Sequence, residues 1–280
     1  MDKTLKEIHF HKFTGAGNDF IMIDGFHLPP DTIEYIISHI PEWCARGTGI
    51  GADGLIIILP KDKLDFVMRY FNSDGSEAEM CGNGGRCAVK FAFITGHSGN
   101  ESKFEAKSGM YSAEIAGDNV KLKMRNTLLP KKRTVTTSIG NISGFYLNTG
   151  VPHFVIFHDE NNFLNTDEIN SWGREIRFHD EFKPEGANVN IVVVIDKHNL
   201  GIRTYERGVE QETLACGTGS TAAGIAAVVS GRNLSPVNLK THSGLILTVD
   251  LSVELEKVTN IYLTGEARLV YEGKINVYRE

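Results

Sequence analysis

The sequence contains one short pattern twice, 135 positions apart: Glu79-Met80-Cys81-Gly82-Asn83-Gly84-Gly85 and Leu214-Ala215-Cys216-Gly217-Thr218-Gly219-Ser220. At the same offset, other residues also coincide, namely Tyr70 with Tyr205, Glu77 with Glu212, Ala88 with Ala223, Ala92 with Ala227, Gly96 with Gly231 and Ser108-Gly109 with Ser243-Gly244. Self-similarity over this length indicates that the chain contains two copies of one structural unit, each with a thiol at the same point.

The repeat also decides the expected domain organisation. A chain of 280 residues can form one large domain or two ordinary ones, and the duplication favours two. Residues 269–280 have no counterpart in the repeat but alternate like a strand, so we expect them to return and complete the first domain. The predicted domains are 1–127 with 268–280, and 128–267.

The composition is that of an ordinary globular protein. The formal charge of −6 argues against nucleic acid as a partner, and the only tight basic cluster, Lys131-Lys132-Arg133, is expected to be a solvated loop. The longest apolar runs, Leu55 to Leu59 and Ile191 to Ile195, have the length of strands and cannot cross a bilayer. No stretch resembles a signal peptide. We therefore expect a cytoplasmic protein without a membrane partner.

Helix-length runs follow both cysteine loops, over 85–95 and 220–230. Each ends at a glycine that can cap it, Gly96 or Gly231. Both runs are apolar nearly all round, which predicts helices that are buried on every side.

Strands over 66–71 and 202–205 lead into the two loops, and short alternating strands follow the helices in both halves. A further helix is expected over 31–39, after Pro29-Pro30. The predicted fold is α+β, with two pseudo-symmetric domains, each a curled, mostly antiparallel sheet or barrel around one central helix.

The four cysteines fall into two kinds. None belongs to a CxxC pair or to a zinc-site spacing, so we expect no metal. Cys44 and Cys87 are expected to be buried small hydrophobic residues. Cys81 and Cys216 instead lie in glycine-rich turns at helix starts, where backbone N–H groups and the helix dipole favour a thiolate and can hold a carboxylate.

A pair of thiols related by a two-fold repeat suits the inversion of a stereocentre. If the two loops face each other, one thiolate can remove an α-proton while the other thiol donates a proton from the opposite side. The N–H groups of the turns would stabilise the charge that develops on the carboxylate. No pyridoxal phosphate site or GxGxxG motif is recognisable, so no cofactor is expected.

The chain resembles the diaminopimelate epimerase family over nearly its whole length. The resemblance rests on motifs in this order: Gly17-Asn18-Asp19-Phe20, Gly49-Ile50-Gly51-Ala52-Asp53-Gly54, Phe71-Asn72-Ser73-Asp74-Gly75-Ser76-Glu77, Met80-Cys81-Gly82-Asn83-Gly84, Pro152-His153, Tyr205-Glu206-Arg207-Gly208 and Ala215-Cys216-Gly217-Thr218-Gly219. It implies a cofactor-independent isomerase that interconverts LL- and meso-2,6-diaminopimelate in lysine and peptidoglycan precursor synthesis. It further implies a homodimer whose domains close around substrate.

The resemblance also implies a role for each matching residue. Cys81 and Cys216 would be the acid/base pair, with His153 and Glu206 supporting proton transfer. The reacting carboxylate would be held by Gly82, Asn83, Gly217 and Thr218. The distal amino acid end would be held by Asn18, Asn72, Asn188 and Arg207, with Glu206 at the amino groups. Asn188 and Asn190 compete for one of these roles, and alignment to the family favours Asn188.

Three positions depart from the family pattern. Val151 stands where many members have Asn, Gly47 replaces a common His, and Gly54 lies where some members carry Gln. None of these is at a thiol, so they bear on substrate contacts rather than on the reaction.

Other interpretations remain open. A proline or hydroxyproline racemase would have the same build, but typically carries His where Asn83 stands and needs no distal clamp such as Arg207. A redox protein could use Cys81 and Cys216 as a switchable disulfide, and we expect oxidation to inactivate the enzyme. A non-enzymatic relative is disfavoured by the duplication of both thiols.

Overall fold

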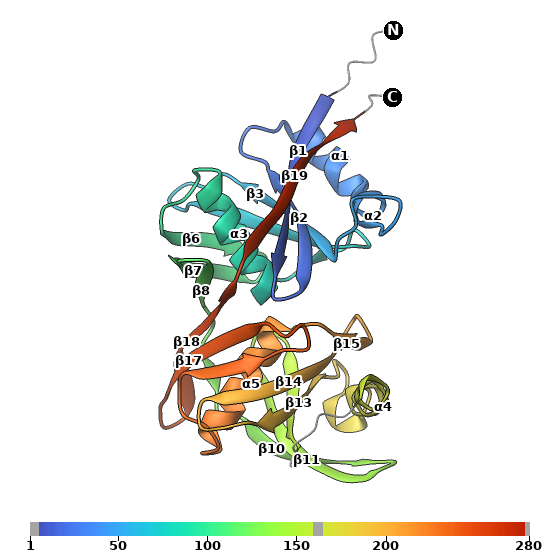
Figure 1. Cartoon of the computed structure of the whole chain (residues 1–280), viewed down its shortest axis with the longest axis vertical. Helices are drawn as coiled ribbons and strands as arrows, with labels where there is room; N and C mark the ends of the chain where they lie inside the picture. The colour runs from blue at the N-terminus through green and yellow to red at the C-terminus, as the bar shows by residue number, and fades with distance from the viewer. Residues whose placement is uncertain (1–5, 159–164, 278–280) are drawn as a thin grey trace. The chain divides into compact units, whose positions relative to one another are not determined.

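The computed structural model describes residues 6–158 and 165–277. The chain divides into two compact units, Met1–Leu122 with Glu266–Glu280, and Lys123–Gly265. Each unit consists of a curved sheet that wraps around one helix, with further helices outside it (Figure 1).

The strands of the first unit are β1 (Lys6–Gly15), β2 (Asn18–Asp24), β3 (Gly54–Leu59), β4 (Phe66–Asn72), β5 (Glu77–Ala78), β6 (Glu101–Ala106), β7 (Gly109–Ala116), β8 (Asn119–Lys123) and β19 (Arg268–Val277). They pair in the order β19-β1-β2-β3-β4-β6-β7-β8, and β5 forms a hairpin with β4. Only β2–β3 and β4–β6 are parallel.

The strands of the second unit are β9 (Thr127–Leu128), β10 (Lys131–Thr137), β11 (Gly140–Asn148), β12 (Pro152–Phe157), β13 (Asn188–Val194), β14 (Asn199–Glu206), β15 (Gln211–Thr213), β16 (Val237–Lys240), β17 (Ile246–Val253) and β18 (Lys257–Glu266). Their order is β10-β11-β12-β13-β14-β16-β17-β18, with β9 added beside β18. Again two pairs are parallel, β12–β13 and β14–β16. The two units therefore have the same topology.

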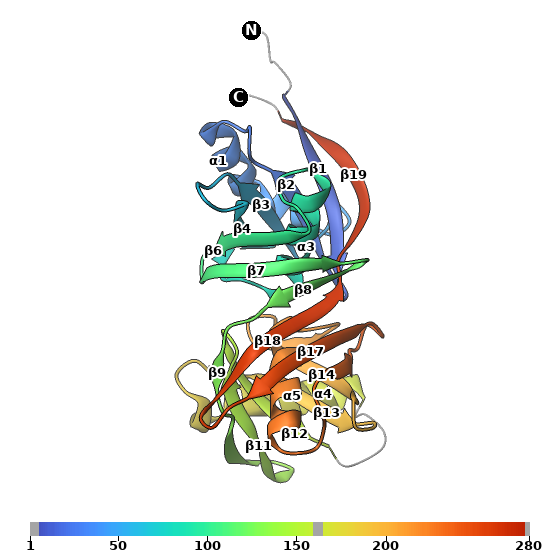
Figure 2. The ribbon, with the colours of Figure 1, turned by 90° about the vertical axis from the view of Figure 1, so that its left-hand side faces the viewer.

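The first strand position is filled differently in the two units. In the second unit, β10 precedes its partner β11 directly in the chain. In the first unit the equivalent partner of β1 is β19, which comes from the far end of the sequence. Figure 2 shows β19 running beside β1. Residues 278–280 of the expected C-terminal strand lie outside the described residues.

The helices inside the sheets are α3 (Gly82–Ile94) and α5 (Gly217–Val229). As expected from their apolar sequences, nearly all of their residues are buried. Both begin three residues earlier than predicted, because the glycines after each cysteine are part of the helix. Glycine is a poor helix former, which places a sequence-based boundary too late. The cysteines are thus the N-cap residues themselves.

The remaining helices cover the outer faces of the sheets. In the first unit α1 (Pro30–Ser38) and α2 (Ile40–Cys44) pack on the sheet with Ile36 and Trp43 against Ile21 and Ile57. In the second unit α4 (Thr166–Arg177), followed by the short 3-10 helix η1 (Asp180–Phe182), packs on β13 and β14. In the described part of the chain, no helix combines the length and apolar character needed to cross a membrane.

The basic cluster is not a loop, contrary to the prediction. Lys131, Lys132 and Arg133 begin β10, which lies at the end of the strand order. Lysines on such a strand discourage pairing with other chains while their side chains stay in solvent. Arg133 forms an ion pair with Glu181 at 2.9 Å. The cluster therefore has a structural role within the second unit.

Candidate active site

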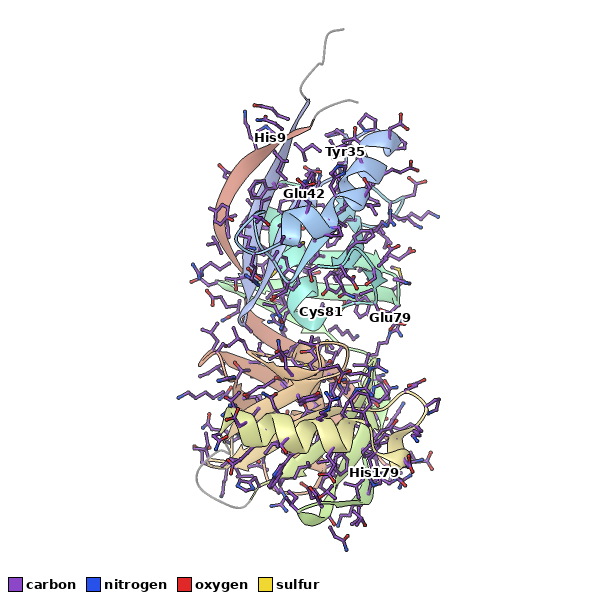
Figure 3. All side chains as sticks on the ribbon, turned by 90° about the vertical axis from the view of Figure 1, so that its right-hand side faces the viewer. His9, Tyr35, Glu42, Glu79, Cys81 and His179 are labelled. Atoms are coloured by element: carbon purple, nitrogen blue, oxygen red, sulfur yellow. The ribbon has the colours of Figure 1, made fainter. Side chains whose placement is uncertain are left out.

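Cys81 is the N-cap of α3, at the start of the inner helix of the first unit (Figure 3). Its backbone is extended, with φ −95° and ψ 129°. The helical ladder starts with the Gly85 N–H donating to the Cys81 carbonyl at 2.7 Å. The N–H groups of Gly82, Asn83 and Gly84 therefore lie outside that ladder, at the positive end of the helix dipole. The half-buried Cys81 at this buried turn is a suitable place for a thiolate, and the turn can hold a carboxylate.

Two of the predicted substrate contacts, Asn18 and Asn83, meet beside this turn. The Nδ2 of Asn83 donates to Oδ1 of Asn18, and the Nδ2 of Asn18 donates to Oδ2 of Asp53 at 3.0 Å. The Oδ1 of buried Asn83 in turn accepts from Nη2 of Arg86 at 3.0 Å. Because a guanidinium can only donate and a carboxylate accepts, this chain fixes which way both amides point.

An ionic cluster anchors the start of β2, where Asn18 lies. Arg46 donates to Asp19 at 2.6 Å and to Asp53 at 2.7 Å. Lys12 lies 2.9 Å from Asp19 and also donates to the Gly51 carbonyl. Burial raises the pKa of Asp19, but the hydrogen bonds from Arg46 and Lys12 outweigh it and lower the pKa overall. The glycine-rich turn is thereby tied to β2.

Asn72 is another predicted substrate contact. It lies opposite Gly54, on the neighbouring strand β3. Asn72 ends β4, and its Nδ2 donates to Ser76 Oγ at 3.1 Å. Among the described contacts, it is not bonded to the other predicted ligands of the first unit. A Cβ at Gly54 would lie 2.7 Å from the Tyr70 ring and closer still to the Phe71 carbonyl. This backbone therefore has no room for a side chain such as Gln at position 54.

Cys216 occupies the equivalent position in the second unit, as the N-cap of α5. The ladder starts with Ser220 N–H donating to the Cys216 carbonyl at 2.8 Å. The Thr218 hydroxyl lies 3.4 Å from the thiol sulfur, and the Thr218 carbonyl accepts from Thr149 Oγ1 at 3.0 Å. Both units thus present a thiol and the N–H groups of a glycine-rich first turn.

His153 is fully buried, and its ring is oriented by Asn190. The Oδ1 of Asn190 accepts from Thr204 Oγ1 at 3.0 Å, so its Nδ2 faces His153 Nδ1 at 3.1 Å. The proton of the neutral ring is then on Nε2, which has no partner in the described part of the chain. Burial, and secondarily the charge of Arg207, lower the pKa of His153 to about 3. His153 is therefore a neutral donor. Asn190 also packs against Gly219 of α5.

Asn188, Glu206 and Arg207 gather at the ends of β13 and β14. The Oδ1 of Asn188 accepts from the backbone N–H of Arg207 at 2.9 Å, and its Nδ2 donates to the Pro152 carbonyl at 3.0 Å. Glu206 accepts from the Thr213 hydroxyl at 2.9 Å. The Asn188 amide is thus committed to shaping the strand ends, while the Glu206 carboxylate is held beside β15.

Buried polar residues next to the predicted site were missed by the sequence analysis. Arg86 and Thr149 were not considered, and Asn190 was set aside in favour of Asn188. Each of them holds a predicted site residue, Asn83, Thr218 or His153. The signal available in the sequence was a polar residue inside an otherwise apolar run, as for Asn190 before Ile191.

Cys44 and Cys87 are buried, which confirms the expectation that both are buried small residues.

The two units, each a curved sheet around one inner helix, define a class of two-unit α+β proteins. A hydroxyproline epimerase from Agrobacterium vitis superposes with a TM-score of 0.71 at 15% identity, over 98% of this chain and 94% of that one. A PhzF-family phenazine biosynthesis protein from Bacillus anthracis gives 0.68 at 15% identity, over 96% and 99%. These likenesses confirm the predicted fold class.

The sequence comparisons are more specific. The model of the diaminopimelate epimerase family matches residues 10–127 and 145–270. The diaminopimelate epimerase of Aquifex aeolicus is 43% identical over 285 residues, which cover 96% of this chain and 98% of the relative. That of a Hydrogenobaculum species is 42% identical over 276 residues, covering 95% and 97%. The chain belongs to the diaminopimelate epimerase family.

Proposed function

We propose that this chain interconverts LL- and meso-2,6-diaminopimelate without a cofactor, with Cys81 and Cys216 as the two bases. The observation that carries the proposal is the duplicated geometry of these thiols, each at the N-cap of an inner helix. Membership of the diaminopimelate epimerase family supports the substrate. The product would serve lysine and peptidoglycan precursor synthesis.

The reaction moves one proton at each face of the α-carbon. A thiolate removes the α-proton from one face and becomes a thiol. The other thiol donates its proton to the opposite face and becomes a thiolate. The intervening carbanion is stabilised by N–H groups around its carboxylate, offered by Gly82-Asn83 and Gly217-Thr218. Exchange with solvent then restores the starting protonation of the two sulfurs.

The other predicted residues would bind and orient the substrate. Because His153 is neutral, its Nε2–H serves as a hydrogen-bond donor beside the reacting centre rather than as a charged acid. The Glu206 carboxylate would accept from an amino group. The distal amino acid end would be held by Asn18, Asn72, Asn188 and Arg207. We also propose that the protein is a cytoplasmic homodimer, which sizing chromatography with light scattering tests.

The decisive experiment incubates the reduced protein with LL-diaminopimelate in deuterated water and follows the meso isomer and α-deuterium. We expect inversion with solvent deuterium incorporated. Cys81→Ala or Cys216→Ala should each lower the inversion rate by about 10²–10⁴-fold or more, since each removes one acid/base group.

Cys44→Ala is the matched control, because Cys44 is a buried thiol on α2 away from the inner helix. It should leave the rate within about twofold, on the order of a conservative substitution away from the site. Inversion of proline or hydroxyproline in place of diaminopimelate would instead assign the chain to the racemases of the same fold. Inversion that persists in either thiol variant would contradict the two-base reaction.

A further inference from the structure

Arg86 is a buried cation without a carboxylate partner in the described part of the chain. It lies in α3 and is fully buried. Its Nη1 donates to the Gly82 carbonyl at 3.1 Å and its Nη2 to Asn83 Oδ1 at 3.0 Å, while Nε has no acceptor among the described residues. Burying a charge that no counter-ion compensates is strongly unfavourable. A nearby anion would stabilise this buried guanidinium.

Two thiols are the ionisable groups that interact with Arg86. Burial lowers the pKa of Arg86, and the charges of Cys87 and Cys81 oppose that change. Cys87 cannot be the anion near neutral pH, because burial raises its pKa to about 12. Cys81 remains. The Arg86 guanidinium donates to the carbonyl of Gly82, the residue directly after Cys81 in the first turn of α3.

The charged groups on the surrounding strands are already engaged with one another. The inner helix α3 packs against β1, β2, β3, β4, β7 and β19. The ionic pairs in and beside these strands include Lys12 and Arg46 with Asp19, His11 with Glu272, Lys274 with Glu7, His97 with Asp24, Arg69 with Glu77, and Arg268 with Glu266. Of these, Glu266 acts on the Cys87 thiol. None of them neutralises Arg86.

The second unit has a neutral residue at the equivalent position. Thr221 follows Cys216 by the same five residues that separate Arg86 from Cys81. It is fully buried, and its Oγ1 donates to the Gly217 carbonyl at 2.9 Å, just as Arg86 donates to the Gly82 carbonyl. The two helix starts therefore share one hydrogen-bond pattern but differ by a full positive charge.

We infer that Arg86 is a positioning residue that makes the two thiols unequal: it stabilises the thiolate of Cys81 and fixes the Asn83 and Asn18 amides, whereas Cys216 rests as the thiol. The inference rests on the proposed two-base reaction and adds to it the resting protonation state of each thiol. The resting enzyme would then have a base at Cys81 and an acid at Cys216, ready for one direction of inversion. Catalysis in the other direction would first require the proton to move between the sulfurs.

The test measures the rate of alkylation by iodoacetamide as a function of pH, without substrate. Cys216→Ser reports on Cys81, and Cys81→Ser reports on Cys216. The other two thiols stay silent because burial raises the pKa of Cys44 to about 11 and that of Cys87 to about 12. We expect the Cys81 midpoint to lie about one pH unit or more below that of Cys216, a tenfold difference in thiolate. Equal midpoints would overturn the inference, even if no Arg86 variant folds.

Variants separate charge from packing. Arg86→Gln, in the Cys216→Ser protein, should raise the Cys81 midpoint by about one unit, and Arg86→Lys should restore most of that shift. Thr221→Val is the matched control, since it removes the equivalent hydrogen bond without changing charge. It should leave the Cys216 midpoint nearly unchanged. Two outcomes would refute the inference, whether or not diaminopimelate is the substrate. One is a Cys81 midpoint that does not change with Arg86→Gln. The other is a shift of the Cys216 midpoint by Thr221→Val that equals the shift of the Cys81 midpoint by Arg86→Gln.

Discussion

At the scale of single residues, the protonation of His153 is coupled to folding. The pKa of the buried ring is lowered to about 3, while an unfolded chain has the ordinary value near 6.5. Stability from the neutral ring is therefore fully present above pH 6.5 and is lost as the pH falls toward 3. We expect wild-type protein to lose about 2 kcal/mol more unfolding free energy between pH 7 and 5 than His153→Gln, which cannot titrate.

Urea unfolding at the two pH values measures this difference. Comparing the variant with the wild type cancels the carboxylates that titrate over the same range. Identical losses in the two proteins would mean that folding does not lower the pKa of His153, which would contradict its burial as a neutral ring.

The limit of sequence analysis at this scale is set by burial. The thiols could be predicted, because each is marked by glycines and by its copy in the other half. Arg86 could not, because it looks like an ordinary polar residue until strands far apart in sequence enclose it, and Asn190 could be named only as an alternative to Asn188, without its contact to His153. In the buried interior each needs hydrogen-bond partners for its polar atoms, and these partners include Asn83 for Arg86 and His153 for Asn190.

At the scale of elements, one ion pair is duplicated in the hairpins that lead to the thiols. Arg69 pairs with Glu77 between β4 and β5, and Arg203 with Glu212 between β14 and β15. The Glu77 side chain is 33% exposed and that of Glu212 only 2%. Glu212→Gln should therefore cost about 3–5 kcal/mol, because it removes the negative charge of a buried ion pair. Glu77→Gln should cost about 0–1 kcal/mol, since solvent screens its pair.

Denaturant midpoints of the two variants, with circular dichroism to verify folding, check the expected order. The double change Arg203→Met with Glu212→Gln should recover part of the loss, because it removes both charges of the buried pair. Equal costs at the two glutamates would show that burial does not decide the strength of these pairs.

The elements themselves were predicted unevenly. The inner helices could be predicted because both halves show them at one offset. Helix α4 was missed, because the first unit covers the same face with the shorter α1 and α2, so the repeat gives no signal there. A local signal did exist: Asn165 and Glu168 form a capping box at its start.

At the scale of the whole molecule, the chain closes on itself through β19. The alternating pattern of residues 269–280, which have no counterpart in the repeat, predicts a strand that returns to complete the first domain. The structure pairs Lys6 with Val277 and Thr14 with Arg268 in an antiparallel register. The partner of β11, in contrast, is supplied locally by β10. The first unit therefore depends on a strand that follows the whole second unit in the chain.

This topology predicts that the chain tolerates circular permutation at the junction of β18 and β19. Joining residue 280 to residue 1 connects β19 to β1 through residues 278–280 and 1–5, as β10 is connected to β11 by a short turn. A permutant that starts at Ala267 and ends at Glu266 should keep every strand pair of the first unit.

Truncation after Glu266 should instead expose β1 and lower amide protection in β1 and β2, while β12 and β13 stay protected, since their pairing lies within the second unit. Hydrogen exchange followed by mass spectrometry compares the two chains directly. Protection of β1 that survives the truncation would show that β19 is dispensable. A permutant that loses this protection would show that the order of the strands in the chain matters beyond their pairing.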